Sequence, residues 1–163
     1  MDLRTYVERI LRGHYAMARA DPPRWARADL DELAESAHDA AQRPQPFPAP
    51  GHLAVALGAR VVPRAPARFC GEGTALGVVC YRWAPDAATR GLRILHGLAH
   101  VLLHRTRDAS TEADAWILTA SLAVPRSRLT HARVDPDAAS RHLPEWLVVE
   151  RLIESRVRKA QAV

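Results

Sequence analysis

The sequence has 163 residues and a mass of 18.0 kDa, a length that suits one domain with a short extension. Apolar residues make up 48% of it, which excludes a mainly disordered chain, and no run approaches the roughly 20 apolar residues that span a bilayer. The net charge is +5, but the basic residues, all arginine except Lys159, are scattered along the chain. A nucleic-acid-binding surface would gather them on one face, so we expect no direct binding to nucleic acid and no membrane segment.

The cellular location is predicted from the N-terminal residues and the cysteines. Residues 1–15 carry a charge every few positions and lack the apolar stretch of a secretory signal. Cys70 and Cys80 are the only cysteines, lie on expected strands and do not form a CxxC metal motif. We therefore expect a cytoplasmic protein whose cysteines are reduced and lie at core positions or at positions from which one bridge could form.

The N-terminal part of the chain is expected to contain two helices. Apolar residues at helical spacing predict the first at 2–20, which Pro22 ends, and the second at 29–42. Closely spaced prolines exclude a long helix and predict a linker at 44–51. We expect residues 1–43 to be a helical extension that packs on the main domain or on a partner, and that can be removed without unfolding the rest.

The main domain is expected at 52–159 and combines helices with a small sheet. Residues 77–83 (GVVCYRW) are rich in β-branched and aromatic side chains, and residues 71–74 (GEGT) have the composition of a turn. These pieces predict an antiparallel sheet, so the expected fold class is α+β, with a helical hairpin and a C-terminal helix packed on that sheet. In chain order we expect a helix at 52–58, strands at 59–63, 68–70 and 77–83, and helices at 88–105, 111–123 and 144–159.

A pair of histidines on the expected helix at 88–105 is the first candidate for chemistry. His96 and His100 are four residues apart, which places both imidazoles on one helix face, as in helices that give two nitrogens to one zinc ion. Glu112 begins the next helix after a short turn, so an antiparallel hairpin would return its carboxylate to the imidazoles. Two histidines and a glutamate, with a fourth position open for water, form a catalytic zinc site of the thermolysin type. The alternative is a pair of structural histidines that arises by chance.

His104 cannot bind the same ion as both other histidines. It lies eight residues after His96, a rise of roughly 12 Å along a helix, whereas two ligands of one zinc ion each lie about 2 Å from it. We expect His104 either to support a metal ligand by a hydrogen bond or to cap the end of the helix.

The residues around these side chains resemble a known family. The run LRILHGLAHVLLH at 92–104 is similar to the active-site helix of the ImmA/IrrE family of metallopeptidases, an HExxH helix continued by two leucines and a third histidine. The run EADAWILTASLAVP at 112–125 resembles that family's E-x-E-A-N-x-F-A-x-x-L-L-M-P segment. HLAVALGARVV at 52–62 resembles its short helix and first strand, and LPEWLVVERL at 143–152 resembles its closing helix. The resemblance covers roughly residues 50–158 and implies a zincin-like helical hairpin that binds Zn²⁺.

In this resemblance His96, His100 and Glu112 take the places of the metal ligands, but Gly97 occupies the position of the general base. In HExxH enzymes the glutamate takes a proton from the attacking water and passes it to the leaving amine, which glycine cannot do. Glycine also lowers helix propensity relative to alanine, so helix stability does not explain its presence. The pattern indicates a domain that has its metal ligands and no catalytic residue at the position of the base.

Two of the other departures from the family pattern concern candidate site residues. Trp116 stands where the family has asparagine, and Asp114 stands where it has a second glutamate. Asp114 and Glu72 are candidates for a substitute base, but we expect both to be solvated surface carboxylates. For Trp116 we expect core packing.

Three functions are consistent with the sequence. The first is a zinc-binding ImmA/IrrE-like protein that is catalytically impaired and acts as a protein-recognition or regulatory module. A transcriptional repressor is a candidate partner, because members of that family are associated with cleavage of helix-turn-helix repressors. The second is an active zinc metallopeptidase that cleaves a repressor-type protein with a substitute base. The third is a DNA-associated accessory protein whose histidine pair is incidental.

Overall fold

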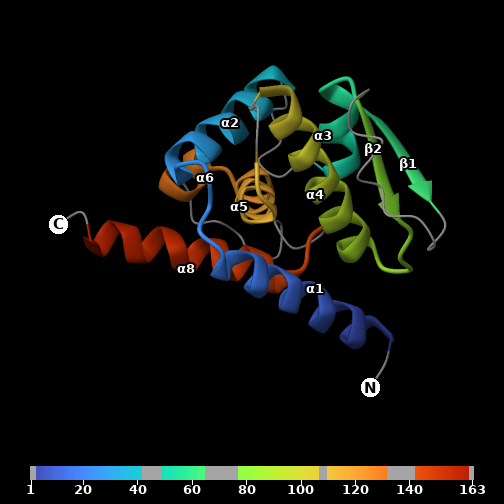
Figure 1. The fold of residues 1–163 in the computed structure, drawn as a ribbon, viewed down its shortest axis with the longest axis horizontal. Coiled ribbons are helices and arrows are strands. Elements are labelled where there is room, and N and C mark those ends of the chain that lie inside the picture. Colours follow the sequence, from blue (N-terminus) through green and yellow to red (C-terminus); the bar gives the residue numbers. More distant parts are fainter. Residues whose placement is uncertain (1–2, 42–48, 65–76, 107–109, 132–141, 162–163) are drawn as a thin grey trace.

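The computed structural model describes residues 3–41, 49–64, 77–106, 110–131 and 142–161 of the chain. This part has an α+β fold that is mostly helical, with a two-stranded sheet on one side of the helices (Figure 1). Each long helix begins and ends within two residues of its expected bounds. The helices are α1 (Leu3–Ala20), α2 (Arg27–Ala40), α3 (Pro50–Ala56), α4 (Ala87–Thr106), α5 (Glu112–Ala123), α6 (Arg126–His131) and α8 (Glu145–Gln161), and the strands are β1 (Arg60–Arg64) and β2 (Val78–Arg82).

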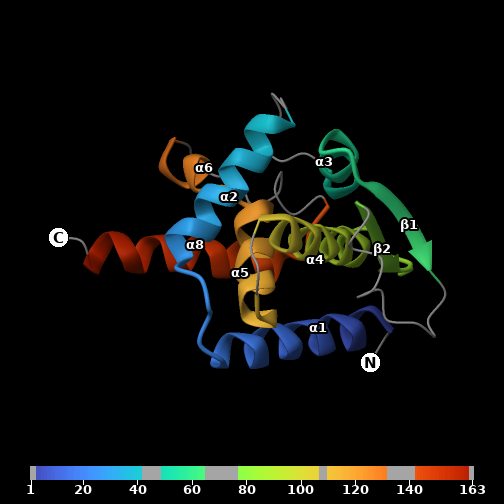
Figure 2. The same ribbon diagram turned by 45° about the horizontal axis from the view of Figure 1, so that its top comes forward.

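Helix α5 lies at the centre of the helical part, with α1, α2, α4 and α8 against it (Figures 1 and 2). Its sequence, EADAWILTASLA, is apolar on every side, and residues 113–123 are all buried. A helix without a polar face needs neighbours all round, because exposed apolar surface is unfavourable in water. The arrangement of the surrounding helices meets this requirement.

The N-terminal extension supplies two of these neighbours. Tyr15 of α1 and Leu30 and Ala34 of α2 are buried in one core with the side chains of α5. The extension therefore forms two helices that pack on the rest of the chain. The linker expected at 44–51 ends earlier than predicted, because α3 already begins at Pro50, whose fixed φ suits the first turn of a helix.

A buried ion pair joins the extension to the C-terminal helix. Arg151 of α8 is 2% exposed; its Nη2 donates to Asp31 Oδ1 of α2 at 2.6 Å, and its Nε donates to the Val124 carbonyl at 3.2 Å. Ser121 Oγ of α5 donates to the same Asp31 oxygen at 2.6 Å. Burial raises the pKa of Asp31, but Arg151 and the hydrogen bond from Ser121 lower it by more, so its net pKa is below the ordinary value. The pair is therefore charged at neutral pH and ties α2, α5 and α8 together.

The sheet differs from the prediction in the direction of its strands. Strands β1 and β2 are parallel, with Arg60 opposite Val78, and the prediction of an antiparallel pair was wrong. The connecting residues, 65–77, are long enough to return the chain to the starting end of β1 before β2 begins, as parallel pairing requires. The prediction rested on a strand at 68–70 joined to the next strand by a turn at 71–74, and both lie outside the described residues.

Some sequence predictions fall on residues outside the described part, namely the strand at 68–70 with Cys70, and Glu72. Within the described part, Cys80 is buried, as expected. Helix α6, which follows Pro125, was not predicted. None of the described helices is both long and apolar enough to span a membrane.

Replacing Asp31 with alanine should destabilise the fold strongly, because it takes the closest charge partner from the buried Arg151 guanidinium and leaves only Glu154, at 3.9 Å. We expect the free energy of unfolding, measured by urea denaturation, to fall by about 3–5 kcal/mol. The control is Glu150→Ala, which removes a partly exposed ion pair of 3.7 Å with Arg12 and should cost less than about 1 kcal/mol. Equal losses in the two variants would contradict the role of the buried pair.

Removing residues 1–43 should abolish cooperative unfolding of the remaining chain, in contrast to the expectation from sequence. The deletion uncovers the side of α5 that Tyr15 and Leu30 cover, and it takes Asp31 away from Arg151. The measurement is thermal unfolding followed by calorimetry and near-UV circular dichroism. A single sharp transition in the truncated protein would show that the extension is dispensable.

Candidate metal centre

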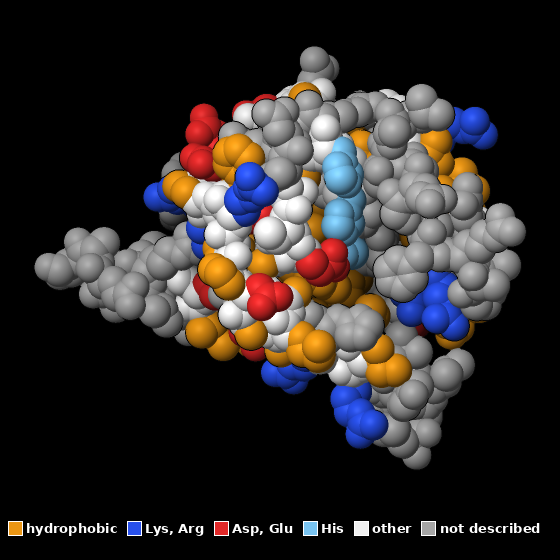
Figure 3. All heavy atoms as spheres, viewed as in Figure 1, with side chains coloured by type: hydrophobic (Ala, Val, Ile, Leu, Met, Phe, Trp, Pro, Cys, Tyr) orange, Lys and Arg blue, Asp and Glu red, His pale blue; other side chains and the backbone are white. Residues whose placement is uncertain are grey.

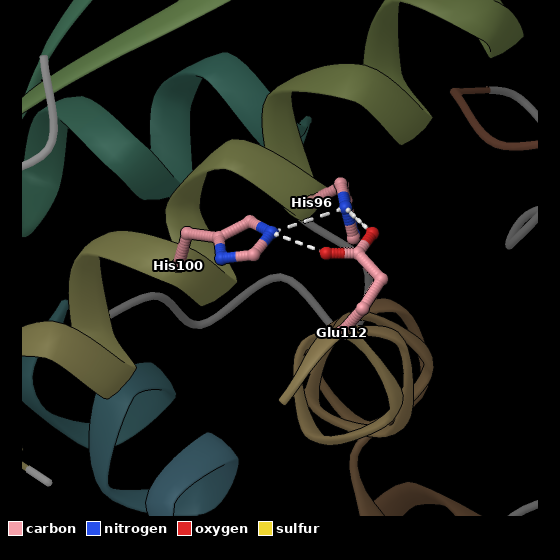
Figure 4. A group of neighbouring side chains, drawn as sticks. All are labelled: His96, His100 and Glu112. Atoms are coloured by element: carbon pink, nitrogen blue, oxygen red, sulfur yellow. Dashed lines mark hydrogen bonds and ion pairs between the residues drawn. The ribbon is translucent and has the colours of Figure 1, made fainter. Parts of the chain in front are cut away.

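Three side chains that could hold a metal ion meet between α4 and α5 (Figure 4). His96 and His100 lie one turn apart on α4, which buried residues such as Leu95 and Leu103 fix in the core. Glu112 is the first residue of α5 and points back toward the two imidazoles. The fold therefore brings together the three side chains that the sequence singles out.

The candidate ligand atoms are as close to one another as the ligands of one tetrahedral ion. Glu112 Oε1 lies 2.9 Å from His96 Nε2, and Glu112 Oε2 lies 3.2 Å from His100 Nε2. The two Nε2 atoms are 3.3 Å apart. Nitrogen or oxygen ligands at about 2.0–2.1 Å from a tetrahedral ion are separated by about 3.3–3.4 Å. The donor set thus fits one metal ion, and three protein ligands leave a fourth position of a tetrahedral site open.

The charge states of these groups also suit a cation. The nitrogens of His100 and His96, at hydrogen-bond distance, hold the pKa of Glu112 well below its usual range, so the carboxylate is ionised. Burial lowers the pKa of His96 by more than the neighbouring Glu112 raises it, and His100 adds a smaller lowering. An ionised carboxylate and a neutral imidazole are the forms that bind divalent metals.

The group is accessible from solvent. The side chains of Glu112, His96 and His100 are 56%, 21% and 29% exposed. Figure 3 shows histidine side chains as a stripe on the molecular surface, with acidic side chains nearby. The three side chains are thus partly open to solvent, as the ligands of catalytic metal sites are, in contrast to those of closed structural sites.

His104 lies outside the converging group. Its side chain is exposed on the next turn of α4, and its ring lies against that of His100, with centroids 6.3 Å apart and planes inclined by 23°. His104 therefore contacts the candidate ligands by packing its ring against that of His100.

Asp114 is buried, so the expectation of a solvated carboxylate was wrong. It accepts hydrogen bonds from the Thr111 backbone nitrogen at 2.7 Å, from Thr111 Oγ1 at 2.9 Å and from the Trp25 backbone nitrogen at 3.0 Å. Thr111 Oγ1 accepts in turn from the Asp114 backbone nitrogen at 3.2 Å, which completes a capping box. The sequence signal for it is a threonine followed three residues later by an acid, directly before an apolar run. This box fixes the first turn of α5, which carries Glu112.

Two residues further along α5 contact His96. The Trp116 ring stacks on the His96 ring, with centroids 4.1 Å apart and planes inclined by 26°. Thr119 Oγ1 lies 3.2 Å from His96 Nδ1. Trp116 is buried, as expected, but sequence reasoning missed its contact with His96 and missed Thr119 altogether. The missed signal is spacing, because Trp116 and Thr119 follow Glu112 by four and seven residues and so share its helix face.

Gly97 faces strand β2 across a gap too small for an added side chain. A Cβ atom at this position would lie 2.9 Å from Val79 Cγ1 and 3.6 Å from the Cys80 carbonyl oxygen. Non-bonded carbon atoms normally lie about 3.5–4.0 Å apart, so any larger residue requires the buried Val79 to move. Glycine at position 97 therefore allows α4 to pack closely on β2.

Comparisons with known proteins were made by sequence and by structure. No family model, curated protein or solved structure matches this chain.

The purified protein should bind one divalent metal ion at this site. His100 and Glu112 each supply a candidate ligand atom. Loss of a residue that only hydrogen-bonds a metal ligand typically weakens metal affinity roughly 10- to 100-fold. His100→Ala and Glu112→Ala should each weaken it by more than that. Affinity is measured for Zn²⁺ by competition with a chromophoric chelator. His104→Ala is the matched control and should bind as the native protein does. Failure of the native protein to take up any divalent metal on titration would refute the site.

Proposed function

We propose that this protein is a zinc-binding, ImmA/IrrE-like protein that is catalytically impaired and acts as a protein-recognition or regulatory module. The observation that carries the proposal is the convergence of His96 Nε2, His100 Nε2 and the Glu112 carboxylate at the spacing of tetrahedral ligands. The order of the matching segments along the chain supports the family resemblance, and the helical pair α4 and α5 presents the three ligands as that resemblance implies.

Zinc is the metal that this donor set favours. Two imidazole nitrogens and one carboxylate are the ligands of many catalytic zinc sites, whereas Ca²⁺ and Mg²⁺ prefer sites made of oxygen alone. When bound, zinc would supply Lewis acidity at the open position. His96 and His100 would hold it from α4, and Glu112 would hold it from the first turn of α5.

The impairment follows from what surrounds the site. Gly97 carries no group that could take a proton from an attacking water or deliver one to a leaving amine. Asp114, the nearest alternative in sequence, is buried and already accepts hydrogen bonds from Thr111 and Trp25. The loss of a general base typically costs about 10² to 10⁴ in rate, so peptide hydrolysis should be very slow.

Recognition of a protein or peptide remains compatible with these losses. Binding an extended segment and transferring a proton use different atoms, so the first can persist without the second. The exposed Glu112 and the solvent-accessible imidazoles leave the metal open to a carbonyl or carboxylate of a partner. A repressor-type protein is the partner class that the family resemblance suggests.

The native protein should therefore show no chelator-sensitive cleavage of a mixed peptide library analysed by mass spectrometry. Binding of labelled library peptides, followed by fluorescence anisotropy, should depend on zinc and be weaker in Glu112→Ala. Robust cleavage by the native protein that disappears in Glu112→Ala would instead establish an active metallopeptidase with a substitute base. Absence of metal binding altogether would leave the histidine pair incidental, as in the DNA-associated alternative.

Restoring the glutamate should require two substitutions. Gly97→Glu alone places its Cβ against Val79 Cγ1 and should lower the unfolding temperature with little gain in activity. Gly97→Glu combined with Val79→Ala removes the obstructing atoms, and should raise chelator-sensitive cleavage of the same library by about 10²-fold or more over the native protein. Val79→Ala alone is the control for the cavity it creates. Equal activity of the single and double variants would show that Val79 does not obstruct the position.

A further inference from the structure

We infer that Thr119 is a positioning residue that fixes the tautomer of His96 and thereby aims its Nε2 lone pair at the metal position. The inference rests on the proposed metal-binding function, and it concerns a position at which the family segment has alanine in place of Thr119. Thr119 is fully buried on α5, and its Oγ1 lies 3.2 Å from His96 Nδ1.

The direction of this hydrogen bond follows from the other partner of the hydroxyl. Thr119 Oγ1 donates its single proton to the carbonyl of Ala115, one turn back on α5, at 2.6 Å. A carbonyl oxygen has no proton to give, so toward His96 the hydroxyl can only accept. His96 Nδ1 must therefore carry a proton, which leaves Nε2 as the ring atom available to a metal ion.

This tautomer changes the meaning of the contact between His96 and Glu112. Where Nε2 carries no proton, its lone pair faces the Glu112 Oε1 atom at 2.9 Å. Two facing acceptors repel each other, and a cation placed between them turns the repulsion into ligation. The hydroxyl of Thr119 thus prepares His96 as an acceptor, which a metal ligand must be.

Trp116 restrains the same ring from another direction. Its indole stacks on the imidazole at a centroid distance of 4.1 Å, and Tyr15 meets the indole edge to face at 5.6 Å. Stacking limits tilting of the His96 ring, and the hydrogen bond to Thr119 limits its rotation about χ2. Each restraint leaves Nε2 directed toward Glu112.

The test replaces Thr119 by valine, which keeps the shape of the side chain and removes its oxygen, and by serine, which retains the oxygen. We expect Thr119→Val to weaken Zn²⁺ binding about 10- to 100-fold in chelator competition, and Thr119→Ser to restore most of that loss. Thermal unfolding of the metal-free variants shows how much of any change is a loss of overall stability.

The decisive readout is the tautomer itself, which a purely structural role of Thr119 would not change. Imidazole ¹⁵N spectra of metal-free protein at about pH 8, where imidazoles are neutral, should show His96 protonated at Nδ1 in the native protein and in Thr119→Ser. In Thr119→Val the ring should shift toward protonation at Nε2. The His96 signals are assigned by their absence in His96→Gln.

The possible failures are distinguishable. If the native protein binds no zinc, the proposed function fails, while the ¹⁵N spectra of metal-free protein still decide the tautomer. A native His96 protonated at Nε2 would overturn the inference. Equal zinc affinity of the native protein and Thr119→Val, with unchanged spectra, would overturn it as well.

Discussion

Helix α5 has no polar side, and this constraint determines where its neighbours lie. Because residues 113–123 are buried, α5 needs cover from several directions at once, and α1, α2, α4 and α8 provide it. At its N-terminal end the helix reaches the surface, where more than half of the Glu112 side chain is exposed. The same helix is therefore the centre of the core and, in its first turn, one wall of the candidate metal site.

Two contacts connect the N-terminal extension to that site through α5. The Trp25 backbone nitrogen donates to Asp114 in the capping box of α5, and Tyr15 packs edge to face on Trp116, which stacks on His96. Metal ligands must be held within a fraction of an ångström, by neighbours whose own positions are fixed. The extension thus supports the site without supplying a ligand from its described residues. The Pro-rich stretch at 44–51 separates the extension from the main domain in composition only. The side chains of α1 and α2 share one hydrophobic core with those of α5.

The features that sequence predicted well are local, and those it missed depend on distant parts of the chain. Apolar periodicity is a property of each helix, so the long helices were placed to within two residues. The direction of strand pairing depends on the path of residues 65–77, which composition alone does not reveal. Asp114 was expected in solvent because carboxylates are usually exposed, and one of its hydrogen-bond partners, the Trp25 backbone nitrogen, lies 89 residues away. The sequence showed that helix stability does not explain Gly97, but the explanation, its contact with Val79, needed the packing of α4 on β2.

Glycine at position 97 has a steric role in the packing of α4 on β2. Val79 Cγ1 lies 2.9 Å from the point where the first side-chain atom would stand, so α4 approaches β2 more closely than a larger residue permits. That approach sets the position of α4, and with it the positions of His96 and His100 relative to Glu112 on α5. An added carboxylate would push α4 away from β2 unless Val79 gave way, and the two imidazoles would move with the helix. The close approach of α4 to β2 at Gly97 is therefore part of what sets the present ligand geometry.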